Sequence, residues 1–567
     1  MAHLPLEPIG KPLEQALEPD RQARNRAWME PLERQLEERR THARAGWGEK
    51  ARAAVRASGR MTAWERIEAL CDPGMPVLPL GTLVHWGRTF ETREAVGAGV
   101  ITALARIHGR HVVVIANDNL VAAGAWWPGT PEKIQRAQTL ALRLALPVVY
   151  LVESSGLFLP EQSGSFAGRT GAGHIFKLNA LLSDRGVPQI AGVFGPCIAG
   201  GGYMPIISDR VVMTEQAYMV IAGQAVIRGA KSLALGGVDL GGPEVHVHVS
   251  GVADLRVPDD ETCLLALRAE VARLPSSAAD FYRGGAPALP PSWDPSELSA
   301  LIPPDHREPC DLRQVLARLL DGSLFHEFLP GTAQEVVTGY GRIQGLWVGM
   351  ASNDLRIFAH PRKPGMARAG GTLYREGVAR LATFSRTCEE DGVPILWFQD
   401  VAGFDIGPEA EALGLLGFGS SLLYTNSTNA TPMITVLLRR ASGAGYYAQA
   451  GLPFDPVVQL ATPCTRLGVM EGRTLATASL GRRAGDAAQP AGPEAQARDR
   501  IAERIERDMD PYEAASRGDV DEIVTLPELR IWLEEVVEAC YQATGNRRVR
   551  NPRIRTVHDV EVLCAGP

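Results

Sequence analysis

The 567-residue chain lacks several features that would place it in common classes of protein. Its 8 cysteines are scattered and form no C-x-x-C pair, so the sequence predicts a reducing, cytoplasmic environment rather than a disulfide framework or a zinc ribbon. No apolar run is long enough for a transmembrane helix, and the N-terminus lacks the apolar segment of a signal peptide. The net charge of −7 gives no support for nucleic-acid binding.

What the chain does contain is a globular composition, with 45% hydrophobic and 22% charged residues over a length that suits two or three cores. Residues 1–60 are rich in Glu, Arg and Ala and predict solvated helices that pack in part on the rest of the protein. Thr62 stands three residues before Glu65, a capping-box spacing that predicts the start of a helix. Buried strands are predicted over 111–115, 147–152, 190–194, 345–351 and 394–398, and helices over 134–146 and 373–389.

The stretch from Gly186 to Pro205 is the most informative part of the sequence, because a buried strand leads into the glycine cluster 200–202. A glycine-rich turn that opens a helix exposes backbone N–H groups and lets a ligand approach them closely. The cluster matches neither the Lys-Ser/Thr ending of a P-loop nor the G-x-G-x-x-G of a dinucleotide site. Two interpretations stay open, an oxyanion hole and a glycine packing corner.

The second half of the chain repeats the first. Gly201 matches Gly445, 244 residues later, and at the same offset Pro188 matches Pro432 and Tyr203 matches Tyr447. The segment 146–156 likewise matches 393–403 at an offset of 247. Two blocks in one order and at nearly one offset favour two homologous domains of about 240 residues each over chance similarity between buried strands.

Two histidines, His246 and His248, alternate along a run over 245–249 that predicts a strand. Side chains two residues apart share one face of a strand, so the pair could bind a metal ion. No third ligand lies nearby in the sequence, and we therefore predict polar core or pocket positions and no metal site.

Longer stretches resemble the carboxyltransferase subunits of biotin-dependent acyl-CoA carboxylases and decarboxylases, over residues 60–545. The matching stretches are GRMTAWERIEALCDPG, GPCIAGGGYMPIISD, ARLLDGSLFHEF, ILWFQDVAGFDIG and ASGAGYYA. Within that family the chain is most similar to the α subunit of glutaconyl-CoA decarboxylase, through ANDNLVAAGAWWPG, LPVVYLVESSG and AGGGY.

The resemblance implies an α/β fold of two homologous crotonase-like (ClpP/crotonase) ββα-superhelix domains in tandem. It divides the chain into a helical extension over 1–59, an acyl-CoA-binding domain over 60–300, a biotin-binding domain over 301–545 and a tail over 546–567. Each domain would supply one oxyanion hole of two backbone N–H groups, one in the turn after a strand and the other at a helix start.

The resemblance also implies the site residues. The acyl thioester oxygen would be held by Leu157 and Gly200, with Gly201 close by, and the biotin ureido oxygen by Phe404 and Ala444, with Gly445 close by. Further substrate-binding candidates, of which all but the glycine equally suit the core, are Ser155, Gly156, Phe166, Phe194 and Tyr203. Further biotin-binding candidates are Gly403, Gly443 and Tyr446.

One departure from the family concerns the second glycine turn, Ser442 to Gly445, where many members carry Gly-Gly-Ala; a shift of the donor by one residue stays open. The chain also has no Ala-Met-Lys-Met biotinylation site and no ATP-grasp domain. The resemblance therefore implies partners: a biotin carrier, either a biotin carboxylase or a membrane decarboxylase subunit that would hold the chain at a membrane, and further copies in a dimer or larger homo-oligomer.

Three functions stay open. The leading hypothesis is a biotin-dependent carboxyltransferase that acts on a glutaconyl-CoA-like thioester, through enolates held in two oxyanion holes. The alternative is the carboxyltransferase β subunit of an ATP-dependent acyl-CoA carboxylase of propionyl-, acetyl- or methylcrotonyl-CoA type. The third is a non-catalytic scaffold subunit that binds coenzyme A.

Overall fold

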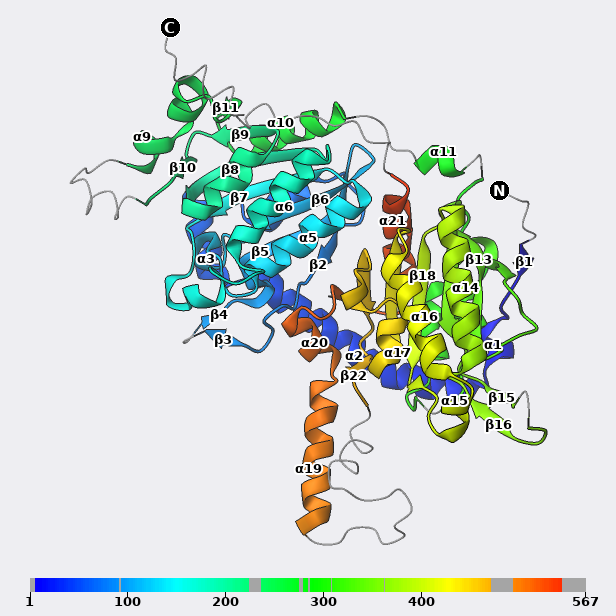
Figure 1. Cartoon of the computed structure of the whole chain (residues 1–567). Coiled ribbons are helices and arrows are strands. Elements are labelled where there is room, and N and C mark those ends of the chain that lie inside the picture. The colour runs from blue at the N-terminus through cyan, green and yellow to red at the C-terminus, as the bar shows by residue number, and fades with distance from the viewer. Residues whose placement is uncertain are drawn as a thin grey trace. The chain divides into compact units, whose positions relative to one another are not determined.

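The computed structural model describes residues 6–90, 93–223, 236–274, 279–283, 286–306, 308–360, 363–470 and 493–542. The chain divides into two compact units. We call residues 39–278, together with 541–567, the N-unit, and residues 279–540, together with 1–38, the C-unit. Each unit is built on one large mixed sheet with helices packed against it (Figure 1).

The N-unit sheet has the strand order β11-β9-β8-β7-β6-β5-β2, with β10 paired to β8. Its strands are β2 (Leu78–Leu80), β5 (Val100–Ile107), β6 (Arg110–Asn117), β7 (Val148–Ser154), β8 (Gln189–Ile198), β9 (Arg210–Thr214), β10 (Tyr218–Val220) and β11 (Leu255–Val257). The strands β2, β5 and β6 pair in antiparallel fashion, and every pairing beyond β6 is parallel.

Helices cover both faces of this sheet. Helices α5 (Thr130–Leu144) and α6 (Ala172–Asp184) lie side by side on one face (Figure 1), and α4 (Ala63–Leu70) and α10 (Asp260–Ala272) pack on the other. Side chains along β7 alternate between the two faces of the sheet, so both faces need a cover. Val149 joins the core beneath α4 and α10, while Tyr150 points to the opposite face. There the Tyr150 hydroxyl accepts hydrogen bonds from Gln138 (3.1 Å) and Asn179 (2.9 Å).

The C-unit sheet has the strand order β1-β12-β13-β14-β18-β20-β21-β23, with β22 paired to β20. Its strands are β1 (Glu7–Pro8), β12 (Leu324–Glu327), β13 (Val336–Ile343), β14 (Leu346–Asn353), β18 (Ile395–Val401), β20 (Met433–Ser442), β21 (Val458–Ala461), β22 (Arg466–Gly468) and β23 (Glu522–Ile523). The antiparallel hairpin β13–β14 continues into the parallel strands β18 and β20, as β5–β6 continues into β7 and β8. The predicted repeat is therefore confirmed in the topology.

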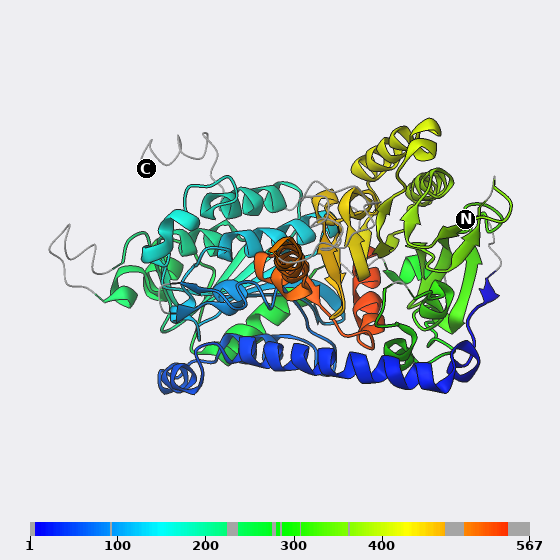
Figure 2. The same ribbon diagram turned by 90° about the horizontal axis from the view of Figure 1, so that it is seen from below.

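Helices α14 (Arg375–Asp391) and α16 (Leu415–Thr428) pack against each other in the C-unit (Figure 1). Helix α21 (Leu529–Cys540) contacts β13 and β14. The predicted N-terminal helices are confirmed as α1 (Leu13–Ala16), α2 (Pro19–Ala45) and α3 (Glu49–Ala57), and Figure 2 shows α2 along its length.

Most predicted elements agree with the structure to within a few residues. The capping box is confirmed, since the Glu65 N–H donates to the Thr62 hydroxyl (3.3 Å) and the Thr62 N–H donates to the Glu65 carboxylate (2.7 Å). The predicted strand at His246 and His248 is wrong, because residues Glu244–Val249 form a π-helix. Its hydrogen bonds close within the segment, as from the Ser250 N–H to the Val245 carbonyl (2.8 Å), so the alternating pattern does not pair with another strand.

Candidate active site: two pairs of backbone turns

The predicted donor Leu157 lies in a turn after β7 that Trp126 holds in place. The Trp126 N–H donates to the Gly156 carbonyl (2.9 Å), and the Phe158 N–H donates to the Trp126 carbonyl (2.8 Å), which makes a parallel bridge between Trp126 and Leu157. Successive N–H groups of an extended chain point to alternate sides. The N–H group of Leu157 therefore points away from this bridge. Within the part of the chain that the structure describes, it has no hydrogen-bond acceptor.

The second predicted donor, Gly200, opens a short helical turn after β8. The turn η4 (Ala199–Gly202) runs directly into α7 (Tyr203–Ile207). Ala199 has a left-handed backbone with φ of 53°, which is uncommon for a residue other than glycine. The first N–H groups of such a turn have no acceptor within it, so Gly200 can donate outward.

The two turns of the N-unit touch each other. A Cβ atom added to Gly201 would lie 3.2 Å from the Ser154 Cβ, closer than side chains normally pack. Glycine at position 201 therefore lets the helical turn approach the end of β7 without a clash. The structure thus brings together the turns that carry Leu157 and Gly200.

The C-unit builds the same first turn. Phe404 lies in β19 (Gly403–Phe404), which pairs in parallel with β17 (Thr372–Leu373). The Asp405 N–H donates to the Leu373 carbonyl (3.0 Å), so the Phe404 N–H before it points away from this pairing. The residues that hold this turn correspond to those of the N-unit at the repeat offset of 247.

The second turn of the C-unit is the start of α17 (Gly443–Ala448), in which Ala444 is the second residue. Gly443 has φ of 55°, close to that of Ala199 at the equivalent position. A Cβ added to Gly445 would lie 2.8 Å from Val401 Cγ2 and 3.3 Å from the Gly403 Cα, so these two turns touch as well.

A cavity of about 440 Å³ opens beside the C-unit turns. Both predicted donors line it, and so does much of α16. The lining residues are Phe404, Asp405, Glu411, Leu415, Leu416, Gly417, Gly419, Ser420, Leu423 and Ala444. Its volume and mixed lining are typical of small-molecule sites.

A second cavity, of about 580 Å³, is also lined by Ala444 and includes Gly443, Tyr446 and Tyr447 in its lining. The Tyr446 hydroxyl is already engaged, since it accepts hydrogen bonds from the Leu452 N–H (2.9 Å) and from Gln459 (3.1 Å). Burial raises the pKa of Tyr446 above its usual value. Tyr446 therefore forms part of the cavity wall, with its hydroxyl turned to the protein.

Two aromatic residues that are not among the predicted site residues, Phe176 and Trp126, lie beside Gly200. A Cβ added to Gly200 would lie 3.4 Å from the Phe176 ring and 3.8 Å from the Trp126 ring. The Phe176 ring also contacts the half-exposed ring of Tyr203 edge to face, with centroids 5.3 Å apart. The signal for this group in the sequence is the pair Trp126-Trp127, and Trp127 stacks on Phe158 of the Leu157 turn.

The other substrate-binding candidates lie in different environments. Ser155 is exposed and its hydroxyl donates to the Ala122 carbonyl (3.0 Å), and Phe166 is 66% exposed. Phe194 is fully buried in the N-unit core, where the Arg66 guanidinium lies 4.3 Å from its ring centre. Phe194 is therefore a core residue, and the other two are accessible to a ligand.

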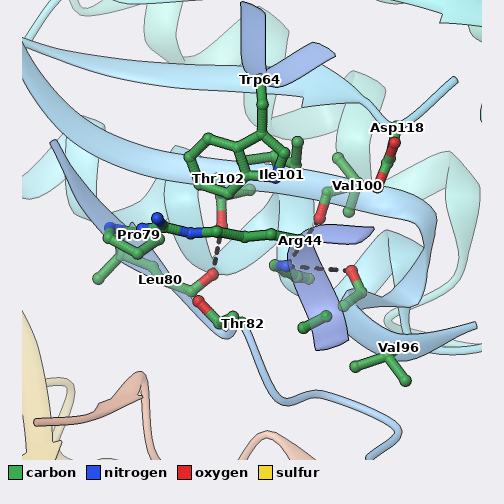
Figure 3. Close-up of a pocket in the computed structure, with 13 residues that line it drawn as sticks. Arg44, Trp64, Pro79, Leu80, Thr82, Val96, Val100, Ile101, Thr102 and Asp118 are labelled. Carbon is green, nitrogen blue, oxygen red and sulfur yellow. Dashed lines mark hydrogen bonds between the residues drawn. The ribbon is translucent and has the colours of Figure 1, made fainter. Parts of the chain in front are cut away.

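A smaller pocket of about 20 Å³ lies elsewhere in the N-unit (Figure 3). In its wall the Lys133 ammonium donates to the carbonyls of Gly97 (3.0 Å) and Val100 (2.7 Å). Burial raises the pKa of Asp118 to about 6, although the Leu120 N–H and the Lys133 charge act in the opposite direction. The cavity has room for about one water molecule, so it cannot hold an acyl-CoA.

Among the residues that the structure describes, no group of three or more His, Cys, Asp or Glu side chains is placed to hold a metal ion. None of the described helices has the length and apolar character needed to cross a membrane.

Comparison with known proteins defines the class. Residues 54–553 match the family described as Carboxyl transferase domain. The chain therefore belongs to the carboxyl transferase family, as predicted, and it is a biotin-dependent acyl-CoA carboxyltransferase with two crotonase-like domains in tandem.

Particular relatives cover most of the chain. "Glutaconyl-CoA decarboxylase subunit alpha" of Acidaminococcus fermentans is 31% identical, over 94% of this chain and 93% of that protein. "Biotin-dependent 3-methylcrotonyl-coenzyme A carboxylase beta1 subunit" of Mycobacterium tuberculosis is 34% identical, over 76% of this chain and 78% of that protein. The crystal structure of the beta subunit of P. aeruginosa geranyl-CoA carboxylase matches with a TM-score of 0.82 and 26% identity, over 96% of this chain and 98% of that one.

Proposed function

We propose that the N-unit holds the acyl-CoA and the C-unit holds biotin, which a partner subunit carries, while a carboxyl group moves between them. The observation that supports this most is the duplicated pair of turns. Each unit carries an outward-pointing N–H after its strand, at Leu157 and at Phe404, beside a helix start with the same left-handed backbone. Two sites of one kind suit a reaction in which two carbonyl oxygens become negatively charged.

In the N-unit the charged species is an enolate. Loss or gain of a carboxyl group at the carbon next to a thioester places negative charge on the thioester oxygen. In a glutaconyl-type thioester the carboxyl group is on the γ-carbon, and the double bond relays the charge from there to the same oxygen. The N–H groups of Leu157 and Gly200 would hold that oxygen, with Gly201 keeping the two turns close. Backbone donors stand ready before the reaction, and removal of one such donor typically raises the barrier by about 3 kcal/mol.

The cavity of the C-unit fits biotin. Its volume of about 440 Å³ exceeds what a fused bicyclic ring needs, and the leucines of α16 provide an apolar wall for that ring. Bound biotin supplies the nitrogen that accepts or donates the carboxyl group. The part of this chain is to hold the ureido oxygen with the N–H groups of Phe404 and Ala444 and to exclude water from the cavity.

We further propose a glutaconyl-CoA-like substrate and the direction of decarboxylation, because the glutaconyl-CoA decarboxylase subunit matches nearly the full length of this chain. The partners would be a biotin carrier, a membrane decarboxylase subunit and further copies of this chain. The cysteines of the described residues are free thiols, which supports a place in the reducing cytoplasm.

A second candidate function has its own support. The 3-methylcrotonyl and geranyl relatives are named as carboxylase beta subunits, and the first is slightly more similar in sequence than the decarboxylase. As a carboxylase beta subunit, the chain would use the same turns to transfer a carboxyl group from biotin to the acyl-CoA, with a biotin carboxylase as partner.

The test incubates the purified chain with glutaconyl-CoA, malonyl-CoA or methylmalonyl-CoA, each with and without free biotin, and measures loss of the thioester. We expect biotin-dependent loss of glutaconyl-CoA. Loss of only the saturated thioesters would favour a carboxylase subunit of propionyl- or acetyl-CoA type, and ATP-dependent turnover with a biotin carboxylase partner would favour one of methylcrotonyl-CoA type. Absence of biotin-dependent loss with all three would contradict the proposed function.

A further inference from the structure

Two buried carboxylates occupy equivalent positions in the two units. Glu153 and Asp400 are 247 residues apart, which is the offset of the repeat, and each precedes a proposed donor by four residues. Their residues are 2% and 1% exposed. Carboxylates this deeply buried need charged or hydrogen-bonding partners, and both of them have such partners.

Each carboxylate stands at an irregularity between two strands. In the N-unit, Val152 pairs with Val193 and Ser154 pairs with Cys197, so Glu153 alone faces three residues of β8. In the C-unit, the pairing between β18 and β20 changes register by the same number of residues at Asp400. Such bulges re-aim a side chain and are common beside active sites.

Two guanidinium groups hold the carboxylate of the N-unit. Arg66 lies 2.7 Å from one oxygen of Glu153, and Arg60 binds the other. Asn119 also donates to Glu153 (3.2 Å), and Arg66 forms a second ion pair with Asp260 (2.8 Å). The last strand residues before the Leu157 turn are therefore tied to helices α4 and α10.

Two guanidinium groups also hold the carboxylate of the C-unit. Arg440 lies 2.9 Å from one oxygen of Asp400, and Arg439 binds the other. Arg439 also donates to the carbonyls of Pro303 (3.3 Å) and Asp305 (3.2 Å). Burial by itself would raise the pKa of Asp400, but the charges of the two arginines hold it below its usual value.

The two units obtain this arrangement from different parts of the chain. The residue equivalent to Arg439, at the offset of 244, is Gly195. A Cβ added to Gly195 would lie 2.7 Å from the Arg60 guanidinium and 3.0 Å from the Glu153 carboxyl carbon. Glycine thus leaves the space that Arg60 fills, so both units place guanidinium groups on the carboxylate although the arginines come from different segments.

We propose that Glu153 and Asp400 are positioning residues for the two oxyanion-binding turns. Each carboxylate, held between two arginines, keeps the end of its strand in place and so aims the backbone N–H of Leu157 or Phe404. The inference rests on the proposed function of these turns. Such positioning matters for catalysis because displacement of a catalytic group by about 1 Å can lower the rate about 100-fold.

The first test measures the turns directly, in the free protein. The variants are Glu153→Gln and Asp400→Asn, with Asp321→Asn as the matched control, since Asp321 forms a buried pair with Arg530 (2.7 Å). Backbone hydrogen exchange is followed by mass spectrometry over peptides that contain 154–158 and 402–405. We expect faster exchange of 154–158 in the first variant, of 402–405 in the second, and of neither in the control.

The second test measures turnover of glutaconyl-CoA with free biotin. We expect kcat to fall about 10- to 100-fold in Glu153→Gln and Asp400→Asn, because the donors are misplaced. The KM values should stay within about twofold, because the contacts that bind the CoA and the ring are unchanged. The charge-preserving variants Glu153→Asp and Asp400→Glu should recover part of kcat, and Asp321→Asn should retain all of it.

A further variant, Gly195→Ala, covers the case in which the charge-removing variants do not fold. It displaces Arg60 without removing a charge, and it should also speed exchange over 154–158. Exchange at the turns that matches the Asp321→Asn control in all variants would overturn the inference. The expected exchange pattern without turnover by the wild type would instead overturn the proposed function and leave the positioning role standing.

Discussion

At the scale of single residues, the approach of the turns depends on the absence of a side chain. Gly201 packs closely against Ser154 in the N-unit, and Gly445 packs closely against Val401 in the C-unit. The two glycines are equivalent residues of the repeat; an added Cβ atom would be tightly packed at Gly201, 3.2 Å from the Ser154 Cβ, and would clash at Gly445, 2.8 Å from Val401. The glycines therefore set the distance between two turns whose N–H groups are proposed to act together.

Another residue, Asp118, should make stability depend on pH. Its folded-state pKa of about 6 lies above the value near 3.9 of an unfolded chain, so the folded protein holds the proton more tightly. The stabilisation of the folded state by protonated Asp118 is fully present at low pH, and it is lost as the pH rises from about 4 to about 6. Over that range the wild type should lose about 3 kcal/mol of unfolding free energy relative to Asp118→Asn.

The measurement is urea unfolding of the wild type and of Asp118→Asn at several values between pH 4 and pH 8. Their difference in unfolding free energy isolates this one group from the other titrating carboxylates, including Asp400. A difference that stays constant with pH would show that the pKa of Asp118 is not raised.

At the scale of elements, the start of α4 matters because this helix carries Arg66 and packs on the N-unit sheet. Thr62→Ala removes the hydroxyl that caps the helix and leaves the Glu65 N–H without its acceptor. We expect a loss of about 1 kcal/mol in the free energy of unfolding, measured in urea. As a control, Thr383→Ala changes an exposed threonine inside α14 and should raise the free energy of unfolding by at most about 0.7 kcal/mol, because alanine has the higher helix propensity. Equal effects of the two substitutions would argue against a stabilising capping box.

At the scale of the whole molecule, the two units should be separable in function. Gly445→Ala places a Cβ 3.3 Å from the Gly403 Cα and so displaces the Phe404 turn, while the residues of the N-unit are unchanged. Turnover of glutaconyl-CoA with biotin should fall by about tenfold or more, because a donor is misplaced. The Kd of glutaconyl-CoA, measured by titration calorimetry, should stay within about twofold.

The control for this prediction is Gly173→Ala in α6, where no atom outside the adjoining helix backbone lies within 4 Å of the added Cβ. It should keep both turnover and binding. Weaker binding of glutaconyl-CoA to Gly445→Ala would contradict the assignment of the acyl-CoA to the N-unit.

Features that depend on neighbouring residues are visible in the sequence of this protein. The repeat, the family, the glycine turns at 201 and 445 and the capping box at Thr62 all follow from short patterns. Such patterns reflect local backbone preferences and hydrogen bonds between residues close in the chain. These interactions can be recognised without knowledge of the fold.

Features that depend on distant residues appear only in three dimensions. The pairing of Arg60 with Glu153 joins residues 93 positions apart, and Phe176 reaches Gly200 only because α6 packs beside η4 and α7. The segment around His248 has the pattern of a strand, but it folds as a π-helix and joins neither large sheet among the described residues. Long-range packing and the pairing of buried charges decided these points, because their free energies depend on which segments the fold brings into contact.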